Sequence, residues 1–131
     1  MSTLKVNTIQ NTSAAHSSTP EQIAQGRAKA WLNLCGGVAG LGQSFALRDS
    51  FNISSVTATA TGRYTVNLTT AMSNTNYCVV SSGHYDSAQL QRVREVGARS
   101  LATSSYILEV SFDGQSAQDA NHVYSAVFGD S

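Results

Sequence analysis

Residues 51–80 read FNISSVTATATGRYTVNLTTAMSNTNYCVV, and this stretch decides the fold class. It contains one charged residue, Arg63, one glycine and no proline. In its middle, Tyr64, Val66 and Leu68 alternate with polar residues. A period of two is that of a half-buried β-strand, in which successive side chains face the core and the outside in turn. The stretch therefore predicts strands whose outward faces consist of Ser, Thr and Asn rather than charged residues.

The same alternation recurs nearer the C-terminus, over residues 106–112 and 123–128. Short strands divided by turns at intervals of about 8–12 residues are typical of antiparallel sandwiches and barrels. We predict an all-β fold, an antiparallel β-sandwich or jelly-roll-like knob, in which residues 19–131 form a single β-rich domain. The turn signals between the strands are Thr61-Gly62, residues 73–76 and Asp113-Gly114.

The first 18 residues differ in character from the rest. Leu4, Val6 and Ile9 are apolar within LKVNTIQ, and a polar run of small residues follows them. LKVNTIQ fits either a short strand or an extended docking arm, and the polar run is typical of a flexible linker. We interpret residues 1–18 as an extended N-terminal arm and linker, with the three apolar residues as candidate docking residues.

A helix start is visible immediately after this arm. Thr19 fits an N-cap, Pro20 the first helical position, and Gln22 the third position of a capping box. Gly26 fits a helix end, which predicts a short helix of about two turns over residues 20–26. The next residues, 27–35, alternate as in a strand, although a continued helix is a rival interpretation.

Composition excludes several classes of function. Lys and Arg together number 8 and so do Asp and Glu, so the chain lacks the basic surface that nucleic-acid binding requires. No apolar run reaches the about 18 residues of a membrane-spanning helix, and the N-terminus lacks the apolar core of a signal peptide. We therefore expect no nucleic-acid partner, no membrane insertion and synthesis in a cytoplasm. Charged residues are only 12% of the chain, which favours association between copies.

No pattern of catalytic or metal-binding chemistry is present. The histidines, His16, His84 and His122, lack the close spacing of a metal motif, and the chain has no GxSxG sequence. Convergence of Cys35 and Cys78 with His84 and His122 is the remaining metal hypothesis. We instead expect both cysteines to be buried free thiols. We predict that the chain is not an enzyme and has no catalytic residues, metal site or cofactor.

Five sequence blocks resemble one known module, in this order: KVNTIQNTS, STPEQIAQGRAKAW, RDSFNISSVT, GRYTVNLTTAM and NTNYCVV. The module occurs in bacteriophage proteins, especially those of phages that infect cyanobacteria, which are identified as tail-fibre or virion structural proteins. The resemblance spans residues 4–80, and the chain departs from it at residues 32–43, LNLCGGVAGLGQ, where the module has a polar, Asn-rich turn. We interpret this Gly-rich run as a turn or a close backbone approach.

The resemblance implies a virion structural protein, assembled in the bacterial cytoplasm. Its leading implication is a tail-fibre or spike component that contributes to host-surface attachment. The alternative is a capsid decoration (cement) protein that stabilises the head as trimers. We expect a homotrimer whose N-terminal arm contacts other virion proteins, with a host-surface glycan as a further partner.

Two further sets of residues are candidates for contacts. Arg92, Arg94 and Arg99 form the basic cluster of the chain, and Tyr85 lies nearby in sequence. The arginines fit a solvated strand face, receptor contact with anionic groups beside a Tyr85 platform for sugar, or a salt bridge across a subunit interface. Trp31, the single tryptophan, fits either core packing between the helix and the sheet or an anchor at a subunit interface.

Overall fold

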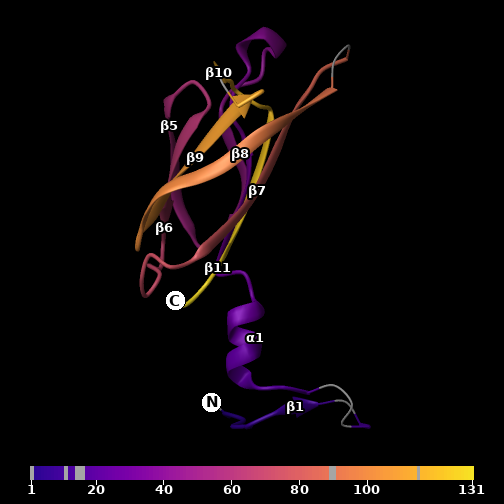
Figure 1. Cartoon of the computed structure of the whole chain (residues 1–131), viewed down its shortest axis with the longest axis vertical. Helices are drawn as coiled ribbons and strands as arrows, with labels where there is room; N and C mark the ends of the chain where they lie inside the picture. Colours follow the sequence, from indigo (N-terminus) through magenta and orange to yellow (C-terminus); the bar gives the residue numbers. More distant parts are fainter. Residues whose placement is uncertain (1, 11, 14–16, 89–90, 115) are drawn as a thin grey trace.

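The computed structural model describes residues 2–10, 12–13, 17–88, 91–114 and 116–131. One short helix and a series of antiparallel strands account for most of these residues (Figure 1). The elements are β1 (Ile9–Gln10), β2 (Ser17–Ser18), α1 (Pro20–Gly26), β3 (Ala30–Cys35), the 3-10 helix Ala39–Leu41, β4 (Ala46–Phe51), β5 (Ile53–Ala60), β6 (Arg63–Leu68), β7 (Cys78–Asp86), β8 (Gln91–Ala102), β9 (Ser105–Phe112), β10 (Ser116–Ala117) and β11 (His122–Phe128).

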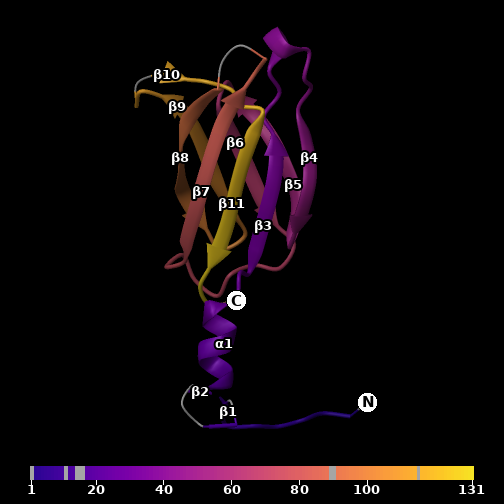
Figure 2. The same cartoon turned by 90° about the vertical axis from the view of Figure 1, so that its right-hand side faces the viewer.

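The described strands outside the N-terminal segment form one antiparallel sheet that curves over itself. Its order is β4-β3-β11-β7-β8-β9-β6-β5, and β10 pairs with β9. The first part of β8 pairs with β7, whereas residues from Glu95 onward pair with β9, so this long strand belongs to both layers. Figure 2 shows the resulting sandwich-like, nearly closed barrel. The predicted all-β antiparallel fold with a short N-terminal helix is therefore confirmed.

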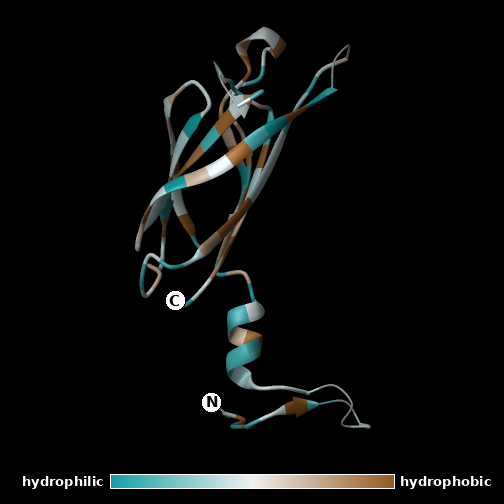
Figure 3. Ribbon diagram, in the orientation of Figure 1, coloured by the Kyte–Doolittle hydropathy of each residue, from teal (hydrophilic) through white to brown (hydrophobic). Residues whose placement is uncertain are grey.

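The core follows the predicted alternation. In β6, Tyr64, Val66 and Leu68 are buried and their neighbours are partly exposed, and β9 buries Tyr106, Leu108 and Val110 in the same way. Figure 3 shows the corresponding change between brown and teal along the strands. Residues that alternate toward one interior remove apolar surface from water, which is the main force stabilising the barrel. Further buried residues come from the facing layer: Ala30, Leu32, Leu34, Val123 and Val127.

Special backbone conformations occur where the chain changes direction. Asn52 has a φ of 57° between β4 and β5, and its side-chain amide donates to the carbonyls of Lys29 and Thr70. Asparagine tolerates this left-handed conformation better than most residues. In the Gly-rich run, a Cβ on Gly36 would lie 2.1 Å from the Tyr64 hydroxyl, so the expected close backbone approach is confirmed there.

The predicted helix is confirmed in its bounds and its capping. The Thr19 side chain accepts a hydrogen bond from the backbone N–H of Gln22 at 3.2 Å, and the Gln22 side chain accepts one from the Thr19 N–H at 2.9 Å. The following strand, β3, confirms the strand interpretation over the continued helix. Helix α1 buries no residue, and Figures 1 and 2 show it below the barrel, with β1 and β2 beyond it.

The structure corrects two interpretations of single side chains. Trp31 is 37% exposed and α1 does not cover it, so core packing between the helix and the sheet is wrong. Cys35 is buried as expected, but Cys78 is exposed, and the two do not form a disulfide. Both corrections have the same cause. Successive side chains of a strand point to opposite faces, and the neighbour of each of these residues occupies the inward position. Among the described residues, no helix combines the length and the apolar character needed to cross a bilayer.

Candidate functional site

A surface hollow lies on the hairpin of β7 and β8. Its volume is about 530 Å³, within the range of small-ligand sites. The two strands are in register there, with His84 opposite Val93 and Asp86 opposite Gln91. This register places ring, carboxylate, amide and aliphatic groups around one opening. The residues lining the hollow are Ser82, Gly83, His84, Asp86, Gln91, Arg92 and Val93.

Two of the three predicted arginines gather with Tyr85 around Phe112. Tyr85 lies between His84 and Asp86 in β7, so its ring is on the face opposite the hollow. The guanidinium carbon of Arg94 lies 5.2 Å from the Tyr85 ring centroid and 5.0 Å from that of Phe112, and that of Arg92 lies 5.1 Å from the Phe112 centroid. These distances allow cation–π attraction. The predicted Tyr85 platform is therefore in contact with a cation of its own chain.

Arg94 is buried to a degree that is unusual for arginine. It is 8% exposed, and its Nε and Nη1 have no hydrogen-bond partner within the described part of the chain. A buried guanidinium loses hydration, and the faces of Tyr85 and Phe112 compensate for only part of that loss. The end of the β7–β8 hairpin therefore combines the exposed Arg92 with a fixed, partly compensated positive charge just beneath it.

Arg99 is not part of this group. Its Nε lies 3.1 Å from one carboxylate oxygen of Glu109, and the Arg63 guanidinium lies 2.6 Å from the other. All three side chains are roughly 40% exposed, so the network is an ion pair on a solvated strand face. Arg94 and Arg99 are five residues apart in one strand, which places them on opposite faces.

The outer surface of the four strands β7, β11, β3 and β4 carries an apolar row. Val80 pairs with Ala126, Ala126 with Trp31, and Trp31 with Phe51. Residues directly opposite each other in an antiparallel pair share a face, so the four side chains form one row across the layer. We call Val80, Ala126, Trp31 and Phe51 the Trp31 row. Phe51 and Val80 are each more than half exposed, so the row is available for contact.

The predicted docking residues of the N-terminal arm are exposed. Leu4 is 87% exposed, and Val6 and Ile9 are exposed as well. Ile9 begins β1, a two-residue strand that pairs with β2. The segment thus contains a short strand, and its aliphatic side chains do not pack on the barrel.

The structure also brings two of the predicted histidines together. His84 and His122 are directly opposite each other on β7 and β11, with ring centroids 4.3 Å apart. Together with Asp86 they form a group whose potential ligand atoms lie within 4.8 Å of one another. Neither cysteine belongs to this group, so that part of the convergence hypothesis is wrong. His16 lies outside the described residues.

His122 has several polar neighbours. An Arg48 nitrogen lies 3.0 Å from its Nδ1, and the Tyr124 hydroxyl lies 3.2 Å from the same atom. The pKa of His122 is lowered from its ordinary value, chiefly because burial disfavours the charged ring and also because of nearby His84 and Arg48, while Asp86 opposes the shift. The neutral ring therefore dominates at neutral pH.

Sequence reasoning did not find the His84, Asp86 and His122 group. Two of the three residues were visible as a His-x-Asp pair, which a strand places on one face. The third lies 38 positions after His84, on a strand whose register follows only from the complete fold.

The comparisons with known proteins gave no neighbour. No protein-family model, curated protein or solved structure matches the chain.

Proposed function

We propose that this chain is a structural protein of a bacteriophage virion, a tail-fibre or spike component that contributes to host-surface attachment. The observation that carries the proposal is the separation of the exposed aliphatic arm from the folded barrel (Figure 1). An attachment protein needs one part that holds it on the particle and another that presents a surface. The resemblance of residues 4–80 to phage virion modules supports the same function.

The arm is the part that would hold the protein on the particle. Leu4, Val6, Ile9 and Ile23 of α1 are exposed in the single chain. Burying one such aliphatic side chain against a neighbour contributes about 1.5–3 kcal/mol, and ordering the arm opposes part of that gain. Several of these contacts together make a docking segment that orders on a virion protein.

The β7–β8 hairpin supplies the surface that would face the host. Figure 2 shows the C-terminal end of β7 at the end of the barrel opposite α1. Tyr85 belongs to this end of β7, Arg92 to the start of β8, and the hollow is lined by residues of both strands. Arg92 is exposed and the buried Arg94 adds positive charge behind it. A hollow of this size whose lining includes the exposed cation Arg92 suits anionic or hydroxyl-rich groups of a surface glycan.

The Trp31 row supports assembly as a homotrimer. It is an exposed apolar strip on an outer surface with few charged residues, and aromatic residues dominate interface energies. Contact through uncharged Ser, Thr and Asn faces also avoids the several kcal/mol that burial of an unpaired charge costs. The same strip favours the second candidate, a capsid decoration protein whose trimers clamp the head, because both functions need contacts between copies.

The experiment is a comparison of phage particles that carry altered arms or altered hairpins. Replacement of Leu4, Val6 and Ile9 together by serine should remove the protein from purified particles, whereas the matched control Asn7→Ser should not. Replacement of Arg92 by alanine should leave the protein on the particle and slow adsorption to host cells.

The outcomes separate the two candidates. Normal incorporation of the serine-substituted arm would contradict the docking proposal. Normal adsorption by particles that carry Arg92→Ala and also lack the Tyr85 ring, through Tyr85→Ala, would contradict host attachment by the hairpin. Particles that adsorb normally but whose heads become fragile would instead identify the decoration protein.

A further inference from the structure

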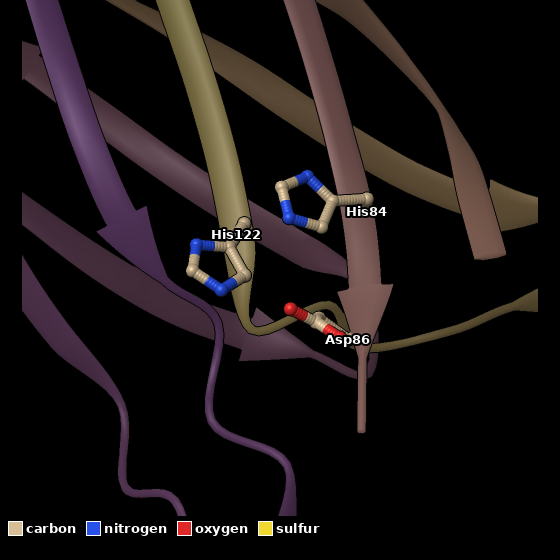
Figure 4. Close-up of side chains that lie close together, drawn as sticks. All are labelled: His84, Asp86 and His122. Atoms are coloured by element: carbon tan, nitrogen blue, oxygen red, sulfur yellow. The ribbon is translucent and has the colours of Figure 1, made fainter. Parts of the chain in front are cut away.

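We propose that His84, Asp86 and His122 form a binding site for one divalent transition-metal ion of the zinc class. The inference goes beyond the proposed function and does not depend on it. Figure 4 shows the two rings and the carboxylate facing a common space between β7 and β11. Two imidazoles and one carboxylate are a ligand set that Zn²⁺ and its neighbours in the first transition row accept.

The backbone fixes two of the three ligands. His84 and His122 are opposite each other in the β7–β11 ladder, so their Cα atoms are held by strand pairing. Asp86 lies two residues after His84 and therefore on the same face of β7. Its backbone N–H and carbonyl both bond to the Asn121 side chain, at 2.9 and 2.7 Å, which fixes the end of the strand beside His122. The site is thus built on ordered strands rather than on a loop.

The rings need one small movement to bind an ion. Their planes are within 9° of parallel and their centroids are 4.3 Å apart, so their lone pairs do not meet at one point. Rotation of the His84 ring about its Cβ–Cγ bond would turn one of its nitrogens toward the space that it shares with His122 and Asp86. That torsion is soft in histidine, and both side chains are only partly buried, so the rotation is inexpensive.

The hydrogen bonds of His122 identify its ligand atom. Nδ1 faces Arg48 and Tyr124, so Nε2 is the nitrogen left for a metal. Without metal, Nδ1 accepts from the Arg48 guanidinium and Nε2 carries the proton. When Nε2 binds a metal, the proton lies on Nδ1 and is donated to the Tyr124 hydroxyl, as metal-bound histidines donate to a neighbouring oxygen.

Arg48 competes with the metal ion, because metal binding moves the His122 proton from Nε2 to Nδ1. A guanidinium cannot accept a hydrogen bond, so it must leave Nδ1 when that atom becomes a donor. Its positive charge also repels the cation. Arg48 is exposed on β4 and can turn into solvent, so it weakens metal binding without blocking it.

Three protein ligands leave coordination positions open. His84 and Asp86 also line the 530 Å³ hollow, so the open positions face a space that water or an oxygen of a bound molecule can enter. A bound ion would also tie β7 to β11 at the end of the barrel, because it joins residues of both strands.

The test is titration of the metal-free full chain with Zn²⁺ in a calorimeter, supported by the visible absorption of Co²⁺. We expect one ion per chain and a rise in melting temperature with zinc. His84→Ala, His122→Ala and Asp86→Asn should each weaken binding at least about tenfold, since loss of even an outer-shell partner typically costs that much. Arg48→Gln should strengthen binding by about tenfold.

Two control variants exclude other zinc ligands. Cys35→Ser and Cys78→Ser should leave the affinity and the Co²⁺ spectrum unchanged, because neither cysteine belongs to the group. Circular dichroism without metal confirms that each variant is folded before titration. The proposal is overturned if folded His84→Ala and His122→Ala bind Zn²⁺ as the parent does, if a control variant abolishes binding, or if Arg48→Gln does not strengthen it.

Discussion

Tyr64→Phe tests whether a polar network fixes one end of the barrel. The Tyr64 hydroxyl lies 3.0 Å from the Asp119 carboxylate and 3.3 Å from the Gly36 carbonyl, and the same Asp119 oxygen accepts the Gly62 N–H at 2.8 Å. The network thus connects β6 with the Gly-rich run, the β5–β6 turn and the segment before β11. Phenylalanine keeps the ring and removes only the hydroxyl.

The expected loss of stability follows from the hydrogen-bond partner that Tyr64→Phe leaves without its donor, the Asp119 carboxylate. A hydrogen bond to a charged group contributes about 1.5–3 kcal/mol, and Asp119 is only partly buried, so we expect Tyr64→Phe to lower the free energy of unfolding by about 2 kcal/mol. The matched control is Tyr106→Phe. Tyr106 is equally buried, but its hydroxyl pairs with the neutral Ser125 hydroxyl at 2.9 Å, so its loss should cost about 1 kcal/mol.

Urea unfolding followed by Trp31 fluorescence measures both variants. With a urea dependence of about 2 kcal/mol per molar, a loss of 2 kcal/mol lowers the midpoint by about 1 M. In an Asp119→Ala background, Tyr64→Phe should cost about 1 kcal/mol or less, because its main partner is already absent. If Tyr64→Phe costs no more than Tyr106→Phe, or the same in both backgrounds, the network does not contribute as argued.

Three further predictions concern pH, the arm and the helix cap. Burial raises the pKa of Tyr106 to about 12, so the folded state keeps a proton that the unfolded state releases near pH 10. This tyrosine leaves stability unaffected below about pH 10 and lowers it by up to about 2.7 kcal/mol as the pH rises toward 12. The pKa of Tyr64 is raised further, by burial and by Asp119. A urea midpoint that stays constant from pH 9 to 12 would refute this assignment. Deletion of residues 2–18 should leave the melting temperature of the barrel within about 2 °C of the full chain, since the arm does not cover the core, and a larger drop by calorimetry would contradict that. Thr19→Ala should destabilise α1 by about 1 kcal/mol, seen as loss of helical NMR shifts over residues 20–26, while the urea midpoint of the barrel is unchanged; a matching fall in that midpoint would show that helix and barrel are coupled.

The strands and the helix could be predicted because their signals are local. The alternation around Tyr64 and the Thr19 capping box each depend on a few adjacent residues, and the structure confirms both. Trp31 shows the limit of this approach. Its exposure depends on which face of β3 meets the core, and the burial of Leu32 and Leu34 decides that only once the strand lies in the sheet.

The candidate site was only partly predictable, for reasons of strand geometry. The spacing of Arg94 and Arg99 already places them on opposite faces of a strand, so their separation could have been expected. The burial of Arg94 could not, because Phe112 reaches it from the neighbouring strand β9. The contact between His84 and His122 likewise depends on the pairing of β7 with β11, which no local pattern records.

The most direct test of the central proposal is the position of this protein on intact phage particles. Gold-labelled antibody against the barrel, viewed by electron microscopy, locates it without any variant. Host attachment predicts gold on the tail or its fibres. Gold spread over the head would contradict attachment and identify a decoration protein, and particles without gold would contradict a virion protein altogether.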